Sequence, residues 1–205
     1  MARALVILAA VLAVGFLIYS TTKTADQYAS AKFENPVDAA DSSALFQKRF
    51  QAQQGLDSLK AYVATNPSDP KARLSYADHL YDAEYWAEAK EQFAAYLKSE
   101  PKDADARVDY AFSIAQADND VEGAIAQLNK TLEYQPDHVN ALFNAGILSL
   151  REVQGANHAD ALVKAKGYFE RARKAAEIKN PDMVPQIDKI LSEMENVGKT
   201  PPAIN

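Results

Sequence analysis

Residues 72–77 of this chain read Ala-Arg-Leu-Ser-Tyr-Ala, and residues 106–111, which begin 34 positions later, read Ala-Arg-Val-Asp-Tyr-Ala. A looser copy, Ala-Leu-Phe-Asn-Ala-Gly, occupies residues 141–146 after a further 35 positions. A repeat of this length is one supersecondary unit that cannot bury its apolar face alone and therefore stacks on its neighbours. The period predicts an array of stacked units.

The same kinds of residue return in the same order after each copy. A small residue is followed four positions later by a large apolar one, and each unit then ends at a proline. The pairs are Ala89/Phe93, Ala124/Leu128 and Ala165/Phe169, and the prolines are Pro67, Pro101, Pro136 and Pro181. Proline cannot continue a helix, so each one marks the end of a unit. The spacing predicts one helix–turn–helix in every unit.

This pattern resembles the tetratricopeptide repeat (TPR) over about residues 36–181. The resemblance implies an all-α fold, in which an α-solenoid of three to four TPR units is closed by a C-terminal capping helix. It also implies a scaffold that holds another protein and carries no chemistry. The composition agrees with a helical fold, because glycine is scarce, with seven residues in 205.

The predicted TPR domain covers residues 38–181. Its units are 38–69, 70–103, 104–138 and 139–181. The first unit is degenerate, since it carries Gly55 where later units carry alanine, and the fourth is extended by a longer turn at 152–158. Residues 182–198 are amphipathic and would cap the end of the solenoid, and residues 199–205 are predicted to be a disordered tail.

The N-terminus carries an uncharged, largely apolar run of 19 residues, Ala4 to Thr22. At about 1.5 Å per residue, a helix of this length spans roughly the ~30 Å hydrocarbon core of a bilayer. We expect a transmembrane anchor over residues 1–22, with residues 23–37 as a polar linker. A cleaved signal peptide is the alternative, although the nearest small-residue site, Ala29-Ser30-Ala31, lies about ten residues beyond the apolar run.

Arg3 precedes the run and Lys23 follows it. Together with the amino terminus, Arg3 favours a cytoplasmic N-terminus by the positive-inside rule. We therefore expect a single-pass protein of the bacterial inner membrane whose TPR domain is periplasmic. The layout looks like bacterial envelope TPR proteins, including those that serve cytochrome c maturation and those that act as chaperones beside the secretion channel.

No motif for catalysis, a cofactor or a metal stands out. The three histidines, His79, His138 and His158, belong to different units and form no HExxH spacing. The absence of cysteine excludes disulfides, thiol catalysis and thiolate metal sites. A net charge of −6 disfavours nucleic acid as a partner. We expect no enzyme, no cofactor, no metal and no small-molecule substrate.

In TPR proteins the first helices of successive units line a concave face, so the resemblance implies a partner-binding groove there. Its residues would be Asp78, Tyr81, Asp82, Asp105, Asp109, Phe112, Asn140, Phe143, Ile147 and Leu150. Such a groove is acidic toward the second and third units and apolar toward the fourth. It suits a protein segment with apolar anchors and some Lys or Arg. Alternatively, Phe143, Ile147 and Leu150 pack against the long helix expected over 160–179.

Charge is distributed unevenly along the chain. Residues 36–163 hold 20 acidic and 11 basic side chains, and residues 164–205 hold six acidic and eight basic ones. The ordinary interpretation of this charge is that it keeps the outer sides of the helices solvated. The functional interpretation is that an acidic face attracts and steers a basic partner. One TPR subclass binds acidic chaperone C-termini through Lys, Arg and Asn. The matching residues here are Ala40, Ala44, Ser75, Asp105 and Asp109, which makes that ligand class a poor fit.

The sequence thus predicts a membrane-tethered TPR scaffold, an assembly factor or adaptor that recruits a protein partner at the membrane. Two other functions stay open. One is a constitutive structural subunit of a membrane complex, with the repeats as a fixed interface. The other is an organelle import-type receptor, with the repeats facing the cytosol.

Overall fold

The computed structural model describes residues 54–152 and 158–199, and within these ranges all regular secondary structure is helical. Residues 54–65 form a helix. It is followed by α3 (Pro70–Asp82), α4 (Trp86–Ser99), α5 (Ala104–Ala117), α6 (Val121–Tyr134), α7 (Val139–Glu152), α8 (His158–Lys179), the short 3-10 helix η1 (Pro181–Met183) and α9 (Val184–Lys199). The predicted all-α solenoid is confirmed for these residues.

The expected anchor over residues 1–22, the linker over 23–37 and the first part of the degenerate unit lie outside the described residues, as does the end of the predicted tail. Among the helices that are described, none is both long and apolar enough to cross a bilayer.

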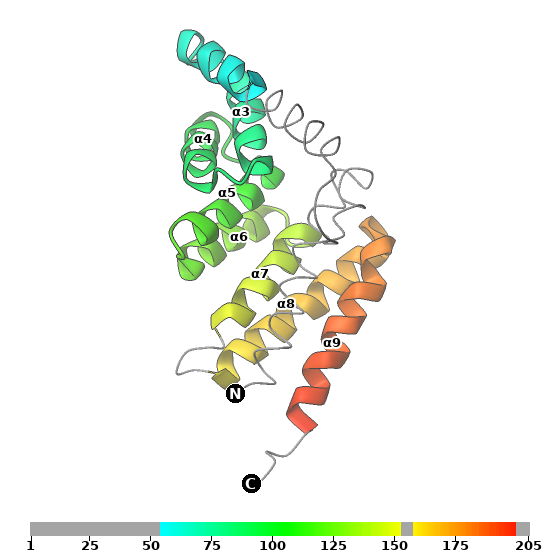
Figure 1. Ribbon diagram of the computed structural model, residues 1–205. Coiled ribbons are helices and arrows are strands. Elements are labelled where there is room, and N and C mark those ends of the chain that lie inside the picture. The colour runs from blue at the N-terminus through cyan, green and yellow to red at the C-terminus, as the bar shows by residue number, and fades with distance from the viewer. Residues whose placement is uncertain (1–53, 153–157, 200–205) are drawn as a thin grey trace, which may run out of the picture.

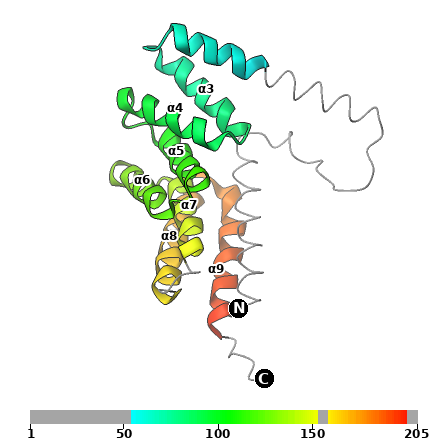
Figure 2. The same ribbon diagram turned by 60° about the vertical axis from the view of Figure 1, so that its left-hand side comes forward.

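The helices stack as successive hairpins, α3 with α4, α5 with α6 and α7 with α8 (Figure 1). Each helix packs on the next one in the chain. The backbones of the first helices α3, α5 and α7 also approach one another across unit boundaries, whereas those of the second helices α4, α6 and α8 lie farther apart. A hydrogen bond from the Tyr168 hydroxyl of α8 to Asn129 Oδ1 of α6, at 2.8 Å, bridges two of the second helices. The first helices therefore form one continuous layer, and the second helices are splayed apart on the other side. Figure 2 shows α9 standing alongside α8 at the end of the stack.

The first helices α3, α5 and α7 each begin where a side chain caps them. Asp69 and Asp103 precede α3 and α5, and in each case Oδ1 accepts hydrogen bonds from backbone N–H groups of the first turn at 3.0–3.1 Å. At the matching position before α7 the residue is His138, whose Nδ1 accepts from the Ala141 N–H at 3.2 Å. These bonds satisfy N–H groups that have no partner within the helix. The caps recur with the period of the repeat.

A large side chain of each second helix packs into the middle of its unit. Phe93, Leu128 and Phe169 are all 0% exposed. The small residue of the first helix leaves room for them. It is Ala77 in the second unit and Gly146 in the fourth, where the Phe169 ring comes closest. Because helices packed at close range cannot accept a larger side chain at such a position, the alternation of small and large residues sets the distance between paired helices.

One arginine stabilises each of the two boundaries between the first three units. The Arg73 guanidinium donates to the Pro67 carbonyl at 2.9 Å and to Gln92 of α4 at 3.0 Å. Arg107 makes the same two kinds of bond one unit later, to the Pro101 carbonyl and to a glutamine of α6. Each arginine ties the turn before its helix to the second helix of the same unit.

The fourth unit has no arginine at this position, because Leu142 stands where Arg73 and Arg107 stand in the two units before it. The Pro136 carbonyl accepts instead from Arg171, which comes from α8. Lys179, at the end of α8, pairs with the neighbouring Asp137 at 2.7 Å. The Lys179 ammonium also lowers the pKa of the Asp137 carboxyl, chiefly through their hydrogen bond. The turn before α7 is therefore held by two side chains from the second half of α8.

The capping helix α9 covers the end of α8. Its Ile187 and Ile190 are buried in the same core as the α7 and α8 residues. Arg173 of α8 bonds Asp188 of α9 and Glu177 of its own helix. Both carboxylates raise the pKa of the Arg173 guanidinium. Apolar burial therefore supplies most of the α8–α9 contact, and exposed ion pairs of this kind add less.

A substitution at Gly146 tests the close packing of the fourth unit. In Gly146→Ala, the new methyl group would lie 2.8 Å from Cζ of Phe169. We expect a net loss of unfolding free energy of about 1 kcal/mol, because overpacking outweighs the gain in helix propensity. Gly167→Ala is the matched control, since nothing lies within 4 Å of its new methyl group, and it should gain about 0.5–1 kcal/mol. Urea unfolding followed by circular dichroism measures both, and equal gains would contradict the packing.

Candidate protein-interaction face

The outward sides of α3 and α5 carry most of the residues that the sequence predicted for a binding site. Helical spacing places three of them together on α3 and three on α5, because residues three, four or seven apart share one side of a helix. They are Asp78, Tyr81 and Asp82 on α3, and Asp105, Asp109 and Phe112 on α5. Since α3 and α5 contact each other, these two sets form one surface across the unit boundary, which we call the acidic face.

Four aromatic rings link the helices under the acidic face. Tyr81 lies edge-to-face with Trp86 and Phe93, with ring centroids 5.0 and 6.1 Å apart. Phe112 of α5 completes the cluster, 5.8 Å from Tyr81 and 5.6 Å from Trp86. Tyr81 and Phe93 are buried, while Trp86 and Phe112 are half-buried and reach the surface. The aromatic cluster therefore joins α3, α4 and α5.

Trp86 is not among the residues that the repeat pattern predicts for this face. It is the first residue of α4, so the turn between α3 and α4 brings it back beside Tyr81. Residues 83–85 form that turn, and Glu84 takes a positive φ of 63° there. The matching residue one unit later, Asn119, has a φ of 53°. The shared turn geometry could have been inferred from the repeat, whereas the direction of the indole ring could not.

The four carboxylates of the acidic face differ in exposure. Asp82 and Asp105 are exposed, Asp78 is half-buried and Asp109 is buried. Asp105 Oδ1 lies 3.3 Å from Nε2 of His138. Because Nδ1 of His138 accepts the bond that caps α7, Nε2 is the nitrogen that carries the ring proton, and it faces Asp105. Asp105 thereby joins the start of α5 to the start of α7.

The start of α5 is fixed by a second contact. The Tyr96 hydroxyl donates to Asp103 Oδ2 at 2.7 Å, while the other oxygen of Asp103 caps α5. Burial and the Asp103 carboxylate both raise the pKa of the Tyr96 hydroxyl well above its ordinary value. With both oxygens engaged, Asp103 holds the first turn of α5, and so the position of Asp105.

The predicted residues of the fourth unit lie elsewhere. Phe143, Ile147 and Leu150 are buried in the core that α7 shares with α8, and only Asn140 is half-buried. Phe143 lies edge-to-face with Phe169 of α8 at 5.7 Å. This is the alternative that the sequence left open, in which the apolar residues of α7 pack against the long helix. The structure thus brings together the predicted residues of α3 and α5 and sets these three apart in the core.

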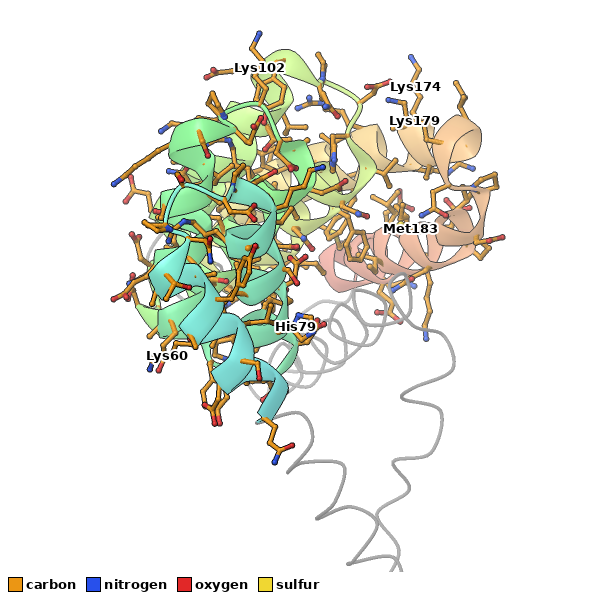
Figure 3. All side chains as sticks on the ribbon, turned by 90° about the horizontal axis from the view of Figure 1, so that it is seen from above. Lys60, His79, Lys102, Lys174, Lys179 and Met183 are labelled. Carbon is orange, nitrogen blue, oxygen red and sulfur yellow. The ribbon has the colours of Figure 1, made fainter. Side chains whose placement is uncertain are left out.

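Three lysines lie along one edge of the molecule. Figure 3 shows Lys174 and Lys179 together at the end of α8, and Lys102 along the same edge of the molecule, while His79 of α3 lies on the other side. His79 is exposed, and its Nδ1 lies 2.8 Å from the Ser75 carbonyl. In residues 54–152 and 158–199 no group of three or more His, Asp or Glu side chains is placed to hold a metal ion.

Solved structures with a similar arrangement of helices are repeat proteins. The TPR2B domain of yeast Sti1 in complex with pHsp70 superposes with a TM-score of 0.54 at 20% identity, covering 62% of this chain and 96% of that one. This chain has the TPR fold. A tetratricopeptide repeat protein from Parabacteroides merdae matches with a TM-score of 0.51 at 20% identity, over 76% of this chain and 65% of that one.

MamA matches the TPR fold of this chain with a TM-score of 0.50 at 14% identity, over 80% of this chain and 98% of that one. No protein-family model and no curated protein sequence matches. At these identities the likeness shows the fold alone.

Replacing Tyr96 tests the anchoring of α5. Tyr96→Phe should lower the free energy of unfolding by about 1.5 kcal/mol at neutral pH, because a part-buried hydrogen bond to a charged group is lost. Folding raises the pKa of the Tyr96 hydroxyl. Its contribution to the free energy of unfolding is therefore fully present below the ordinary tyrosine pKa of about 10 and is lost as pH rises above that value. The difference between wild type and Tyr96→Phe should therefore shrink above about pH 10. Urea unfolding at several pH values measures it, and a difference independent of pH would contradict the assignment.

Proposed function

We propose that this chain is a membrane-tethered TPR scaffold, an assembly factor or adaptor that binds a segment of a partner protein on the acidic face. The observation that carries the proposal is this face itself, a surface of carboxylates and aromatic rings on two adjoining first helices of a TPR fold. Two domains of a protein with the same fold, yeast Sti1, have been solved in complexes with pHsp70 and pHSP90. That precedent supports a protein segment as the ligand.

The apolar run Ala4 to Thr22 supplies the proposed tether. Its length suits a single transmembrane helix, and Arg3 on its N-terminal side favours a periplasmic TPR domain in the inner membrane of a bacterium. A tether raises the local concentration of the scaffold beside membrane-bound or exported partners, so that a weak contact with each partner suffices. Cytochrome c maturation and chaperoning beside the secretion channel are processes in which such a scaffold would act.

Co-purification of partners from the full-length, tagged chain tests the proposal. We expect a substoichiometric set of immature or exported proteins after gentle detergent extraction. The double variant Asp82→Lys/Asp105→Lys reverses the two exposed charges of the acidic face and should lose these partners. Glu91→Lys, an exposed position on α4, makes the same kind of change on a second helix and should keep them. Mass spectrometry quantifies the proteins recovered with each variant.

Two results would count against an assembly factor or adaptor. If one membrane complex co-purifies in fixed stoichiometry, the chain is a structural subunit. If reporter enzymes fused after Asn205 are active only in the cytosol, the orientation is reversed and the import-receptor function gains support.

A further inference from the structure

We propose that His138 makes the junction between the third and fourth units sensitive to pH. This junction is the turn at residues 135–138 together with the starts of α5 and α7. When the imidazole gains a proton, α7 loses the side-chain cap of its first turn, and the ring then holds the junction only through an ion pair with Asp105. Three observations carry this inference: the chemistry of the cap, the position of the ring between two helices and the charges around it.

The first observation is that the cap of α7 differs in chemistry from the two before it. At the starts of α3 and α5 an aspartate oxygen accepts the N–H of the residue three positions later, Ala72 or Ala106, at 3.1 and 3.0 Å. At the start of α7 the acceptor for Ala141 is Nδ1 of His138, at 3.2 Å. An aspartate ordinarily stays ionised down to about pH 4, whereas a histidine ordinarily changes its charge between about pH 5 and 8. Of these three caps, the cap of α7 is therefore the one that mild acid can remove.

The added proton must bind the nitrogen that makes the cap. A neutral imidazole has one donor and one acceptor nitrogen, and in His138 the acceptor is Nδ1. Once Nδ1 also carries a proton, both nitrogens are donors, and the ring can no longer accept the Ala141 N–H. The new positive charge would also stand at the N-terminal end of α7, where the helix dipole disfavours a cation. Protonation therefore leaves the first turn of α7 without its cap.

The second observation is the position of the ring between α5 and α7. Nε2 of His138 lies 3.3 Å from Oδ1 of Asp105, and the histidine side chain is only 12% exposed. Protonation keeps this contact and turns it into an ion pair. Because the Asp105 side chain is 82% exposed, solvent screens the pair, and it offsets the loss of the cap only in part. The link between α5 and α7 therefore persists while the first turn of α7 is released.

The third observation concerns the other charges around the ring. Asp137 precedes His138 in the turn and pairs with Lys179 of α8 at 2.7 Å, while Arg171 of α8 binds the backbone of the same turn. The helix before the turn, α6, ends at Tyr134, and a tyrosine is ordinarily neutral between pH 5 and 8. Asp137 favours a charged ring as Asp105 does, and the two cations of α8 oppose it. Both signs of charge thus surround the ring, and the cap is the contact that protonation removes.

NMR spectroscopy of the full-length chain tests the inference. The chain is labelled with 15N and 13C, kept in solution with a mild detergent and studied between about pH 8 and pH 5. Near pH 8 the ring proton of His138 should be on Nε2, and a scalar coupling should cross the hydrogen bond from the Ala141 amide nitrogen to Nδ1. As the ring gains its proton, this coupling should vanish. The 13Cα shifts of residues 139–142 should lose helical character with the same midpoint.

Three comparisons separate the cap from general effects of acid. The amide of Ala106, which Asp103 caps in the same way one unit earlier, is the internal control and should not change over this pH range. In His138→Asn the new side chain caps a helix well and does not titrate, so residues 139–142 should stay helical at pH 5. Asp105→Asn tests the ion pair. Without this carboxylate the ring is harder to protonate, so the change at Ala141 should move to lower pH.

Several results would overturn the inference. If Nδ1 carries the ring proton near pH 8, or if the ring keeps one charge state down to pH 5, His138 is not a titrating cap. If the ring gains its proton while residues 139–142 stay helical, the start of α7 does not depend on the cap. If the amide of Ala106 changes together with that of Ala141, acid acts on the whole fold. Should His138→Asn fail to fold, the comparison of these two amides within the wild-type chain decides alone.

Discussion

The spacing between paired helices is the constraint on which the rest of this structure depends. In the second, third and fourth units a large side chain from the second helix, Phe93, Leu128 or Phe169, is completely buried. In the fourth unit the Phe169 ring lies against Gly146 of the first helix, and alanine stands at the matching positions 77 and 111. Close packing of this kind leaves no room for a larger side chain. With that distance fixed, the next unit can stack in the same way. The contacts among α3, α5 and α7, and so the continuity of the acidic face, follow from this regular spacing.

The fold could be predicted because its determinants are local and repeated. The prolines Pro67, Pro101 and Pro136 and the small residues Ala77, Ala111 and Gly146 return every 34 or 35 residues, and each acts within its own unit. The arginine bonds at unit boundaries were not foreseen, although Arg73 and Arg107 stand at matching positions. The role of Arg171 could not be inferred from the repeat, because it depends on how far α8 extends.

The binding site was less accessible to sequence reasoning. The repeat shows which side of a first helix faces outward, and this placed Asp78, Asp82 and Asp105 on one surface. It does not show how much of that side neighbouring elements cover. In α7 the outward positions hold Phe143, Ile147 and Leu150, and these side chains contribute to the core instead. Trp86 was missed for the opposite reason, since it starts a second helix and reaches the acidic face only through the turn before it.

The bond from Arg171 to the Pro136 carbonyl has a consequence for the order in which this solenoid comes apart. In a linear array each unit contacts only its neighbours, so terminal units normally fray one helix at a time. Here Arg171 and Lys179 join the second half of α8 to the turn that begins α7. Releasing α8 would therefore also loosen the start of α7. The two helices of the fourth unit are therefore expected to open together, once α9 has detached, rather than one after the other.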